Sequence, residues 1–266
     1  RLSRRITRVR WFIDQLVRLL FPPKCPACGA LLTAGSEVMC PACAADYQAA
    51  TERACPQCLK PLHECTCPNR FLDRHGVHKV IKLFTYHPGE PDRAVNRMVF
   101  RLKRCDSEAT IGFLADQLIK AMEGQMEGGV KYVITGVPRS KAAIRRFGDD
   151  HVHLLCRAVA ARLHIPYVRA VRRIGKEGPQ KKKNYKERMS SARISYAPNE
   201  SVDLHGYRVF LLDDIVTSGA TLAACALAVR KCGARQVTAV VVGSSYRYRD
   251  LIGTKQYYRE KQKYVH

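Results

Sequence analysis

The chain has 266 residues, 46% of them hydrophobic, which is enough for one large domain with its own core and a smaller domain beside it. Forty-six Lys and Arg residues against 23 Asp and Glu residues give a formal charge of +23, which attracts polyanions and anionic membrane surfaces and predicts contact with nucleic acid. No apolar run is long enough to cross a bilayer, and the first residues lack the pattern of a secretory signal. We therefore expect a cytoplasmic globular protein without a transmembrane segment, which can still associate with a membrane surface.

Both ends of the chain are basic. Residues 1–24 carry seven basic side chains and one acidic side chain, with apolar residues near helical spacing, and predict a basic amphipathic helix that ends at Pro22 and Pro23. Its apolar face either packs on the rest of the protein or binds a membrane surface or a partner. Residues 244–266 form a basic tail rich in tyrosine, which either stays disordered or stacks on unpaired bases.

Residues 25–70 are predicted to form a small module held together by metal instead of a hydrophobic core. Eight of the twelve cysteines lie here, mostly as pairs separated by two residues, whose sulfurs can reach one tetrahedral zinc ion. Eight thiolates supply two closed, structural zinc sites. We expect the ligands to group in chain order as Cys25, Cys28, Cys40 and Cys43, then Cys55, Cys58, Cys65 and Cys67. A crossed grouping, or His63 in place of one cysteine, is the alternative.

Residues 71–243 read as strands that alternate with helices. Strands are expected at 77–86, 130–137, 167–171, 207–212 and 236–242, and helices at 91–103, 107–122, 149–164 and 219–232. This alternation predicts an α/β fold, with a mostly parallel sheet covered by helices on both faces.

The most informative segment is residues 209–221. Four apolar residues predict a buried strand, Asp213 and Asp214 follow at its carboxyl end, and small hydroxyl residues with Gly219 lead into a helix. A helix N-terminus after such a turn favours a phosphate dianion, while two adjacent acids suit ribose hydroxyls or a magnesium ion. The alternative is an ordinary capped turn, but the order of strand, acid pair and helix favours a phosphorylated ribose.

This segment resembles the loop that binds phosphoribosyl pyrophosphate (PRPP) in the type I phosphoribosyltransferases. The resemblance implies that Asp213 and Asp214 bind the ribose hydroxyls and are the catalytic residues. It also implies that the 5′-phosphate lies on Thr217, Ser218, Gly219, Ala220 and Thr221. A second turn, at Gly136, Val137 and Arg139, would bind the pyrophosphate with its magnesium.

A basic loop at residues 174–190 contains Lys182, Lys183 and Arg188. In phosphoribosyltransferases a mobile loop closes over PRPP, and basic side chains there offset the charge of the pyrophosphate. A solvated run of charge, or contact with a nucleic-acid backbone, is the alternative.

A cysteine-knuckle module directly before a phosphoribosyltransferase domain resembles the ComF family of competence-associated proteins, from about Cys25 to Val242. Arg145, Gly148 and Asp150 lie where that family has an R-x-R-G-[FY]-[ND]-Q segment, although His151 replaces the glutamine and Gly136 replaces the first proline of a P-V-P turn. The resemblance implies a role in DNA uptake, with binding of single-stranded DNA near the inner face of the membrane.

Two functions follow from these residues. The first is a PRPP-binding protein that handles single-stranded DNA during uptake, in association with the uptake machinery. The second is an active phosphoribosyltransferase that transfers phosphoribose to a nitrogen acceptor in nucleotide metabolism or salvage. A weaker third is a zinc-ribbon adaptor whose transferase domain only senses PRPP. No residue in the sequence identifies the acceptor.

Overall fold

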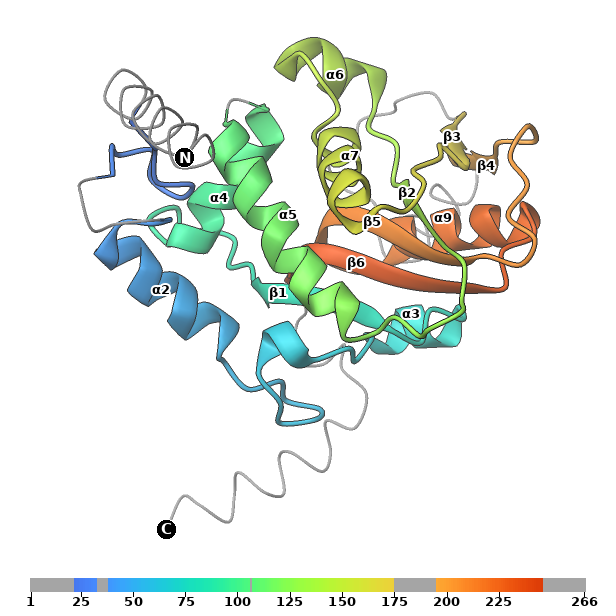
Figure 1. The fold of residues 1–266 in the computed structure, drawn as a ribbon, viewed down its shortest axis with the longest axis horizontal. Helices are drawn as coiled ribbons and strands as arrows, with labels where there is room; N and C mark the ends of the chain where they lie inside the picture. Colours follow the sequence, from blue (N-terminus) through green and yellow to red (C-terminus); the bar gives the residue numbers. More distant parts are fainter. Residues whose placement is uncertain (1–21, 33–37, 106, 175–194, 246–266) are drawn as a thin grey trace, which may run out of the picture.

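The computed structural model describes residues 22–32, 38–105, 107–174 and 195–245 (Figure 1). The predicted helix at 1–24 and the predicted tail at 244–266 lie almost entirely outside these residues. The basic loop with Lys182, Lys183 and Arg188 lies outside them as well. These three expectations therefore stay predictions.

A four-stranded parallel sheet forms the centre of the molecule. Its strands are β1 (Val80–Thr85), β2 (Tyr132–Gly136), β5 (Arg208–Val216) and β6 (Gln236–Ser244), arranged in the order β1-β6-β5-β2. Their interior positions are mostly Val, Ile, Leu and Ala and are buried on both faces, as is typical of parallel strands under helices. The predicted α/β fold with a parallel sheet is confirmed.

Helices cover both faces of the sheet (Figure 1). On one face lie α4 (Ala94–Arg104), α5 (Glu108–Glu123) and α7 (His151–Leu163), and on the other lie α3 (Arg70–Arg74) and α9 (Ala220–Lys231). Alternate residues of β5 supply the two cores, because successive side chains of a strand point to opposite faces. Phe210 packs with the first group of helices and Leu211 packs with α9.

Several elements differ from the prediction. The strand expected at 167–171 is wrong in its bounds, since Tyr167 forms a single bridge to Ile134 and, of the expected residues, only Val171 belongs to a strand. The chain continues into β3 (Val171–Arg173), which pairs antiparallel with β4 (Tyr196–Pro198) in a separate small sheet. The short helix α6 (Lys141–Phe147) was not expected, because it buries none of its residues and so shows no apolar periodicity.

The cysteine module contains two short helices, α2 (Pro41–Thr51) and the 3₁₀ helix η1 (Leu62–Glu64). Tyr47 of α2 anchors the module on the sheet domain, with its ring 6.2 Å from that of Phe84 in β1 and 5.1 Å from that of Phe113 in α5. The two parts therefore share one hydrophobic core. None of the described helices has the length and apolarity needed to cross a membrane.

Candidate functional site

The predicted phosphate-binding segment forms a strand, a bend and a helix, in that order. β5 continues through both acids to Val216, the chain bends at 217–219, and α9 begins at Ala220. Gly219 adopts φ of +84°, and a Cβ there would lie 2.6 Å from Cγ of Leu72. Glycine is thus required at this position, both for the left-handed backbone and for the close approach of Leu72.

The bend carries backbone amides that can bind an anion. Within the described parts of the chain, no acceptor faces the amides of Thr217, Ser218, Gly219 and Thr221. A small hollow of about 50 Å³ is lined by Asp213 and residues 215–222. Because the N-terminus of α9 adds partial positive charge at this point, the hollow can hold a phosphate group.

The segment that follows the cysteine module supports the bend from behind. Asn69, which is fully buried, donates from Nδ2 to the carbonyl of Ser218 at 3.1 Å and accepts the amide of Leu72 at 2.8 Å. Leu72 then packs against Gly219. The sequence gives no signal for this support, because Asn69 and Ser218 are 149 positions apart.

The two acids have different surroundings. Asp214 is held by a lysine and a histidine, since its Oδ2 lies 3.2 Å from Nζ of Lys103 and 2.9 Å from Nε2 of His151. Asp213 has no such partner among the described residues, and its Oδ1 accepts the backbone amide of Asp214 at 2.9 Å. His151 is the residue that replaces a glutamine in the ComF pattern, so this departure has a structural role. The sequence does not reveal Lys103.

These surroundings shift the pKa values of the two carboxyl groups in opposite directions. Burial, together with repulsion from Asp214, raises the pKa of Asp213 well above its ordinary value. Burial also acts to raise the pKa of Asp214, but the hydrogen bond from His151 and the charge of Lys103 outweigh it and lower that pKa. Pairs of acids whose environments separate their pKa values are typical of functional sites.

The turn predicted to bind pyrophosphate lies beside this segment. β2 pairs with β5, and the amide of Val137 donates to the carbonyl of Leu212 at 2.9 Å, directly before the acid pair. Gly136 packs against α7, where a Cβ would lie 2.9 Å from Sγ of Cys156. Arg139 donates to the carbonyl of Lys103 at 3.1 Å and to that of Asp149 at 3.2 Å. The structure therefore brings Gly136, Val137 and Arg139 to the same edge of the sheet as the acids.

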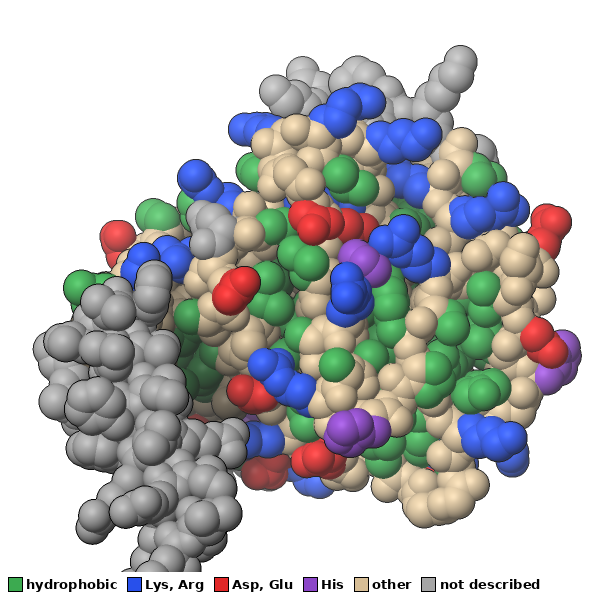
Figure 2. Space-filling view, turned by 45° about the horizontal axis from the view of Figure 1, so that its top comes forward, with side chains coloured by type: hydrophobic (Ala, Val, Ile, Leu, Met, Phe, Trp, Pro, Cys, Tyr) green, Lys and Arg blue, Asp and Glu red, His purple; other side chains and the backbone are tan. Residues whose placement is uncertain are grey.

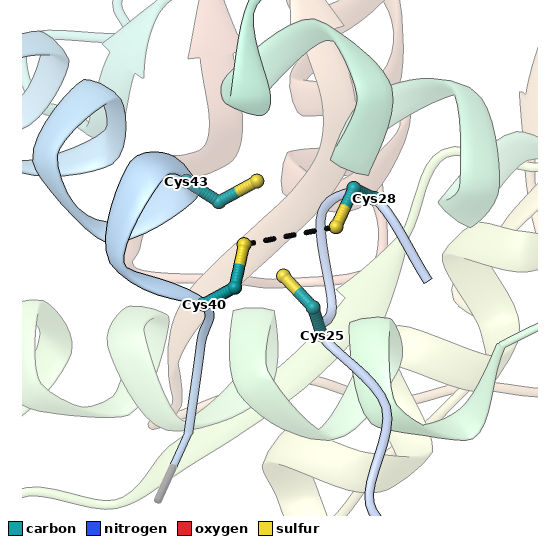
Figure 3. A group of neighbouring side chains, drawn as sticks. All are labelled: Cys25, Cys28, Cys40 and Cys43. Atoms are coloured by element: carbon teal, nitrogen blue, oxygen red, sulfur yellow. Dashed lines mark hydrogen bonds between the residues drawn. The ribbon is translucent and has the colours of Figure 1, made fainter. Parts of the chain in front are cut away.

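The eight cysteines of the module gather into two groups of four, in the predicted chain order. Within each group the sulfurs all lie within 4.8 Å of one another. In the first group, the sulfurs of Cys25, Cys28, Cys40 and Cys43 point toward a common centre (Figure 3). Sγ of Cys28 and Sγ of Cys40 are 3.8 Å apart. That separation equals the roughly 3.8 Å expected for two ligands of a tetrahedral zinc ion with Zn–S bonds of about 2.3 Å.

Each group receives a cation from the sheet domain. Arg97 of α4 donates from Nη2 to Sγ of Cys43 at 3.2 Å, and Nζ of Lys82 in β1 lies 3.2 Å from Sγ of Cys65. Lys82 is buried, and it also reaches the carbonyls of Cys65 and Cys67. Four thiolates around one zinc ion leave excess negative charge, which these cations offset. His63 is not a ligand in either group, because its Nδ1 bonds the carbonyl of Thr51 at 3.0 Å.

Comparison with known proteins agrees with both parts of this description. A double zinc ribbon domain matches residues 16–71, and a phosphoribosyl transferase domain matches residues 135–262. The chain carries a double zinc ribbon and a phosphoribosyltransferase domain. The four-strand parallel sheet with its helices is the type I phosphoribosyltransferase fold, as predicted.

The phosphoribosyltransferase domain also resembles curated proteins. Two adenine phosphoribosyltransferases, from Mycobacterium avium (strain 104) and Mycolicibacterium paratuberculosis (strain ATCC BAA-968 / K-10), are each 38% identical to this chain over 95 residues. The match covers 35% of this chain and 52% of each relative. The chain thus spans about half the length of the curated relatives that it matches.

Matches among solved structures include adenine phosphoribosyltransferases. The one from Leishmania tarentolae has a TM-score of 0.35 and 17% identity, and the match covers 56% of this chain and 76% of that chain. The one from Thermoanaerobacter pseudethanolicus has a TM-score of 0.35 and 19% identity, over 53% of this chain and 82% of that chain.

Because the pKa of Asp213 is raised and that of Asp214 is lowered, neutralising the two carboxyl groups should have opposite effects on the stability of the fold. At pH 7, Asp213→Asn should raise the free energy of unfolding by about 1 kcal/mol, and Asp214→Asn should lower it by about 1–2 kcal/mol. A raised pKa means that ionised Asp213 destabilises the fold, whereas a lowered pKa means that ionised Asp214 stabilises it. Urea unfolding of both variants measures the two changes in the free energy of unfolding. Changes of the same sign in both variants would contradict this account.

The pH dependence follows from the same signs. The gain in the free energy of unfolding from Asp213→Asn should appear only above the ordinary aspartate pKa of 3.8. Below that pH the carboxyl is protonated in both the folded and the unfolded chain. The contribution of Asp214 is present above the same value and is lost as the pH falls through its lowered pKa. Repeating the unfolding measurement from pH 2 to pH 8 tests both expectations.

Proposed function

We propose that the phosphoribosyltransferase domain binds PRPP with magnesium at the carboxyl edge of the sheet. Asp213 and Asp214 bind the ribose hydroxyls, and the amides and hydroxyls of Thr217, Ser218, Gly219, Ala220 and Thr221 hold the 5′-phosphate. The observation that carries this proposal is the bend after β5, where amides that have no acceptor among the described residues lie beside the acid pair. Gly136, Val137 and Arg139 lie next to it on β2 and are proposed to hold the pyrophosphate.

The reaction that this arrangement supports is displacement of pyrophosphate from C1 of the ribose by a nitrogen nucleophile. The protein contributes position and electrostatics, because the charge develops on the ribose and on the departing pyrophosphate. Lys103 and His151 keep Asp214 ionised, so that it can accept a hydrogen bond from a ribose hydroxyl. Magnesium on the diphosphate would offset the charge of the leaving group. The curated relatives are adenine phosphoribosyltransferases, so adenine is the first acceptor to test.

Calorimetric titration with PRPP and magnesium tests the site. The wild-type chain should bind PRPP, and the double variant Asp213→Asn with Asp214→Asn should lose binding by more than a hundredfold, because both hydroxyl acceptors are replaced. Asp203→Asn is a matched control, since Asp203 is exposed and contacts His205 in a loop away from the bend. Equal affinity of the wild type and the double variant would refute the site assignment.

A second proposed function is binding of single-stranded DNA, in agreement with the resemblance to the ComF family and its role in DNA uptake. The net charge of +23 supports it. Within the described residues, α6 projects from the domain (Figure 1) and exposes Lys141, Arg145 and Arg146. Figure 2 shows several Lys and Arg side chains in its upper part. Association with the inner face of the membrane, through the helix proposed at residues 1–24, belongs to the same proposal.

The DNA proposal predicts a defined salt dependence. Replacing Lys141, Arg145 and Arg146 by Ala should weaken binding of a single-stranded oligonucleotide and reduce the slope of log K against log salt by about 2, at roughly 0.7 for each lost phosphate contact. Replacing Lys60, Lys131 and Lys231 by Ala removes the same charge from exposed positions elsewhere and serves as the control. Equal slopes for the two triple variants, measured by fluorescence anisotropy, would exclude α6 as the contact surface.

A further inference from the structure

The peptide unit between Ser218 and Gly219 lies at the centre of the phosphate-binding bend. A trans peptide unit is planar, and its C=O and N–H groups point in opposite directions, so the direction of the Ser218 carbonyl fixes that of the Gly219 amide. The backbone at Gly219, with φ of +84°, restrains this unit little, because glycine adopts both signs of φ readily. A contact from outside the bend must therefore fix which of the two groups faces the ligand.

Asn69 supplies this contact. Its side chain is fully buried and donates from Nδ2 to the carbonyl of Ser218 at 3.1 Å. The hollow that can hold a phosphate is lined by Asp213 and residues 215–222, so the carbonyl points away from the hollow toward Asn69, and the amide of Gly219 points to the opposite side. Turning the peptide unit over would break this bond and place a carbonyl oxygen where a phosphate oxygen has to lie. The contact thus favours the orientation that binds an anion.

The second cysteine group holds the chain just before Asn69. Asn69 follows Cys67 by two residues, and Nζ of Lys82 donates to the carbonyl of Cys67 at 3.0 Å. Nε2 of Gln57, which lies between two cysteines of the same group, donates to the carbonyl of Pro68 at 3.2 Å. Zinc at this group would therefore fix the loop from which the side chain of Asn69 reaches the bend.

The helix α3 holds the chain just after Asn69. Oδ1 of Asn69 accepts the amide of Leu72 at 2.8 Å, which makes Asn69 the N-cap of this helix. Leu72 packs against Gly219 in the bend, and beyond the helix the carbonyl of His75 accepts Nη1 of Arg230 in α9 at 3.3 Å. Asn69 is therefore held from both sides, by the cysteine loop and by a helix that is attached to α9.

We propose that Asn69 is a positioning residue for the phosphate site, and that zinc at the second cysteine group sets the affinity of the bend for a phosphate monoester through this residue. The inference rests on the proposed binding of PRPP at the bend. Zinc fixes the loop, the loop fixes Asn69, and Asn69 fixes the peptide unit, so that the amide of Gly219 meets the phosphate without reorganisation. Loss of this zinc frees the loop, and the peptide unit then samples both orientations.

Asn69→Ser tests the positioning role. Serine still caps α3, but it lacks the amide that donates to the carbonyl of Ser218. The affinity of the full, zinc-loaded chain for ribose 5-phosphate, measured by calorimetry, should fall at least fivefold. The affinity for magnesium pyrophosphate, which the turn at residues 136–139 is proposed to hold, should stay within twofold. A general loss of structure would instead weaken the binding of both ligands.

Asn199→Ser is the matched control. Nδ2 of Asn199 also donates to a backbone carbonyl, that of Arg169 at 2.9 Å, but Asn199 lies beside Cys232 at the other end of α9. The affinity of this variant for ribose 5-phosphate should equal that of the wild type. Equal affinities of Asn69→Ser and Asn199→Ser would overturn the proposal, and so would an equal loss of both ligands in Asn69→Ser.

One cysteine variant in each group tests the part played by zinc. Cys58→Ser and Cys28→Ser each remove one ligand, and each should lose one zinc ion by elemental analysis. Only Cys58→Ser should weaken the binding of ribose 5-phosphate, by at least threefold, because the contacts found for the first group in the described chain lead to α4 and α5. Equal affinity of the two variants would overturn the role of zinc. Should Cys58→Ser not fold, the result for Asn69→Ser decides.

Failure of the proposed PRPP site can be told apart from failure of this inference. A wild type that binds neither ribose 5-phosphate nor PRPP would refute the proposed function. Nitrogen-15 relaxation dispersion of the free chain then decides the positioning role, because reorientation of the peptide unit should broaden the amide signal of Gly219 in Asn69→Ser and leave it sharp in the wild type. Identical Gly219 signals in the two proteins would overturn the role of Asn69.

Discussion

The structure depends on the parallel pairing of β5 between β2 and β6. Parallel neighbours end at the same edge of a sheet, so the acid pair of β5, the turn after β2 and the serines that end β6 meet there although they are far apart in the sequence. The hydrogen bond from Val137 to Leu212 and the one from Ser245 to Val216 fix these loops at the two sides of the acids. Each proposed subsite for PRPP follows from this order of strands.

The zinc module is packed against the sheet domain and contacts the proposed sugar-phosphate site. It shares the core through Tyr47, receives Arg97 and Lys82 from the sheet domain at its two cysteine groups, and leads into Asn69, which supports Ser218 in the bend. A lysine as deeply buried as Lys82 is costly without a compensating negative charge, and the neighbouring thiolates supply it. The module is thereby joined to the proposed sugar-phosphate site by packing, by charge and by a hydrogen bond.

The sequence predicts what is encoded locally. The strand, acid pair and bend at 209–221 occupy consecutive positions, and the cysteine pairs lie close together in the sequence, so the segment and the first of the expected cysteine groupings were predicted correctly. Asn69 and Lys103 reach the site only through tertiary contacts and carry no local pattern. The strand expected at 167–171 is reduced to one bridge at Tyr167 for a related reason, because a β-rich run does not reveal how many of its residues pair with the neighbouring strand. The assignment of individual residues to PRPP stays a prediction.

The most direct test of the central claim is to observe the amides of the bend while a sugar phosphate binds. In a nitrogen-15 NMR titration of the full chain with ribose 5-phosphate, the amide signals of Ser218, Gly219 and Thr221 should move by the largest amounts and saturate together. These signals should move because each amide gains a hydrogen bond to a charged phosphate oxygen. Saturable shifts confined to residues away from 213–221, with these amides unmoved, would contradict the account.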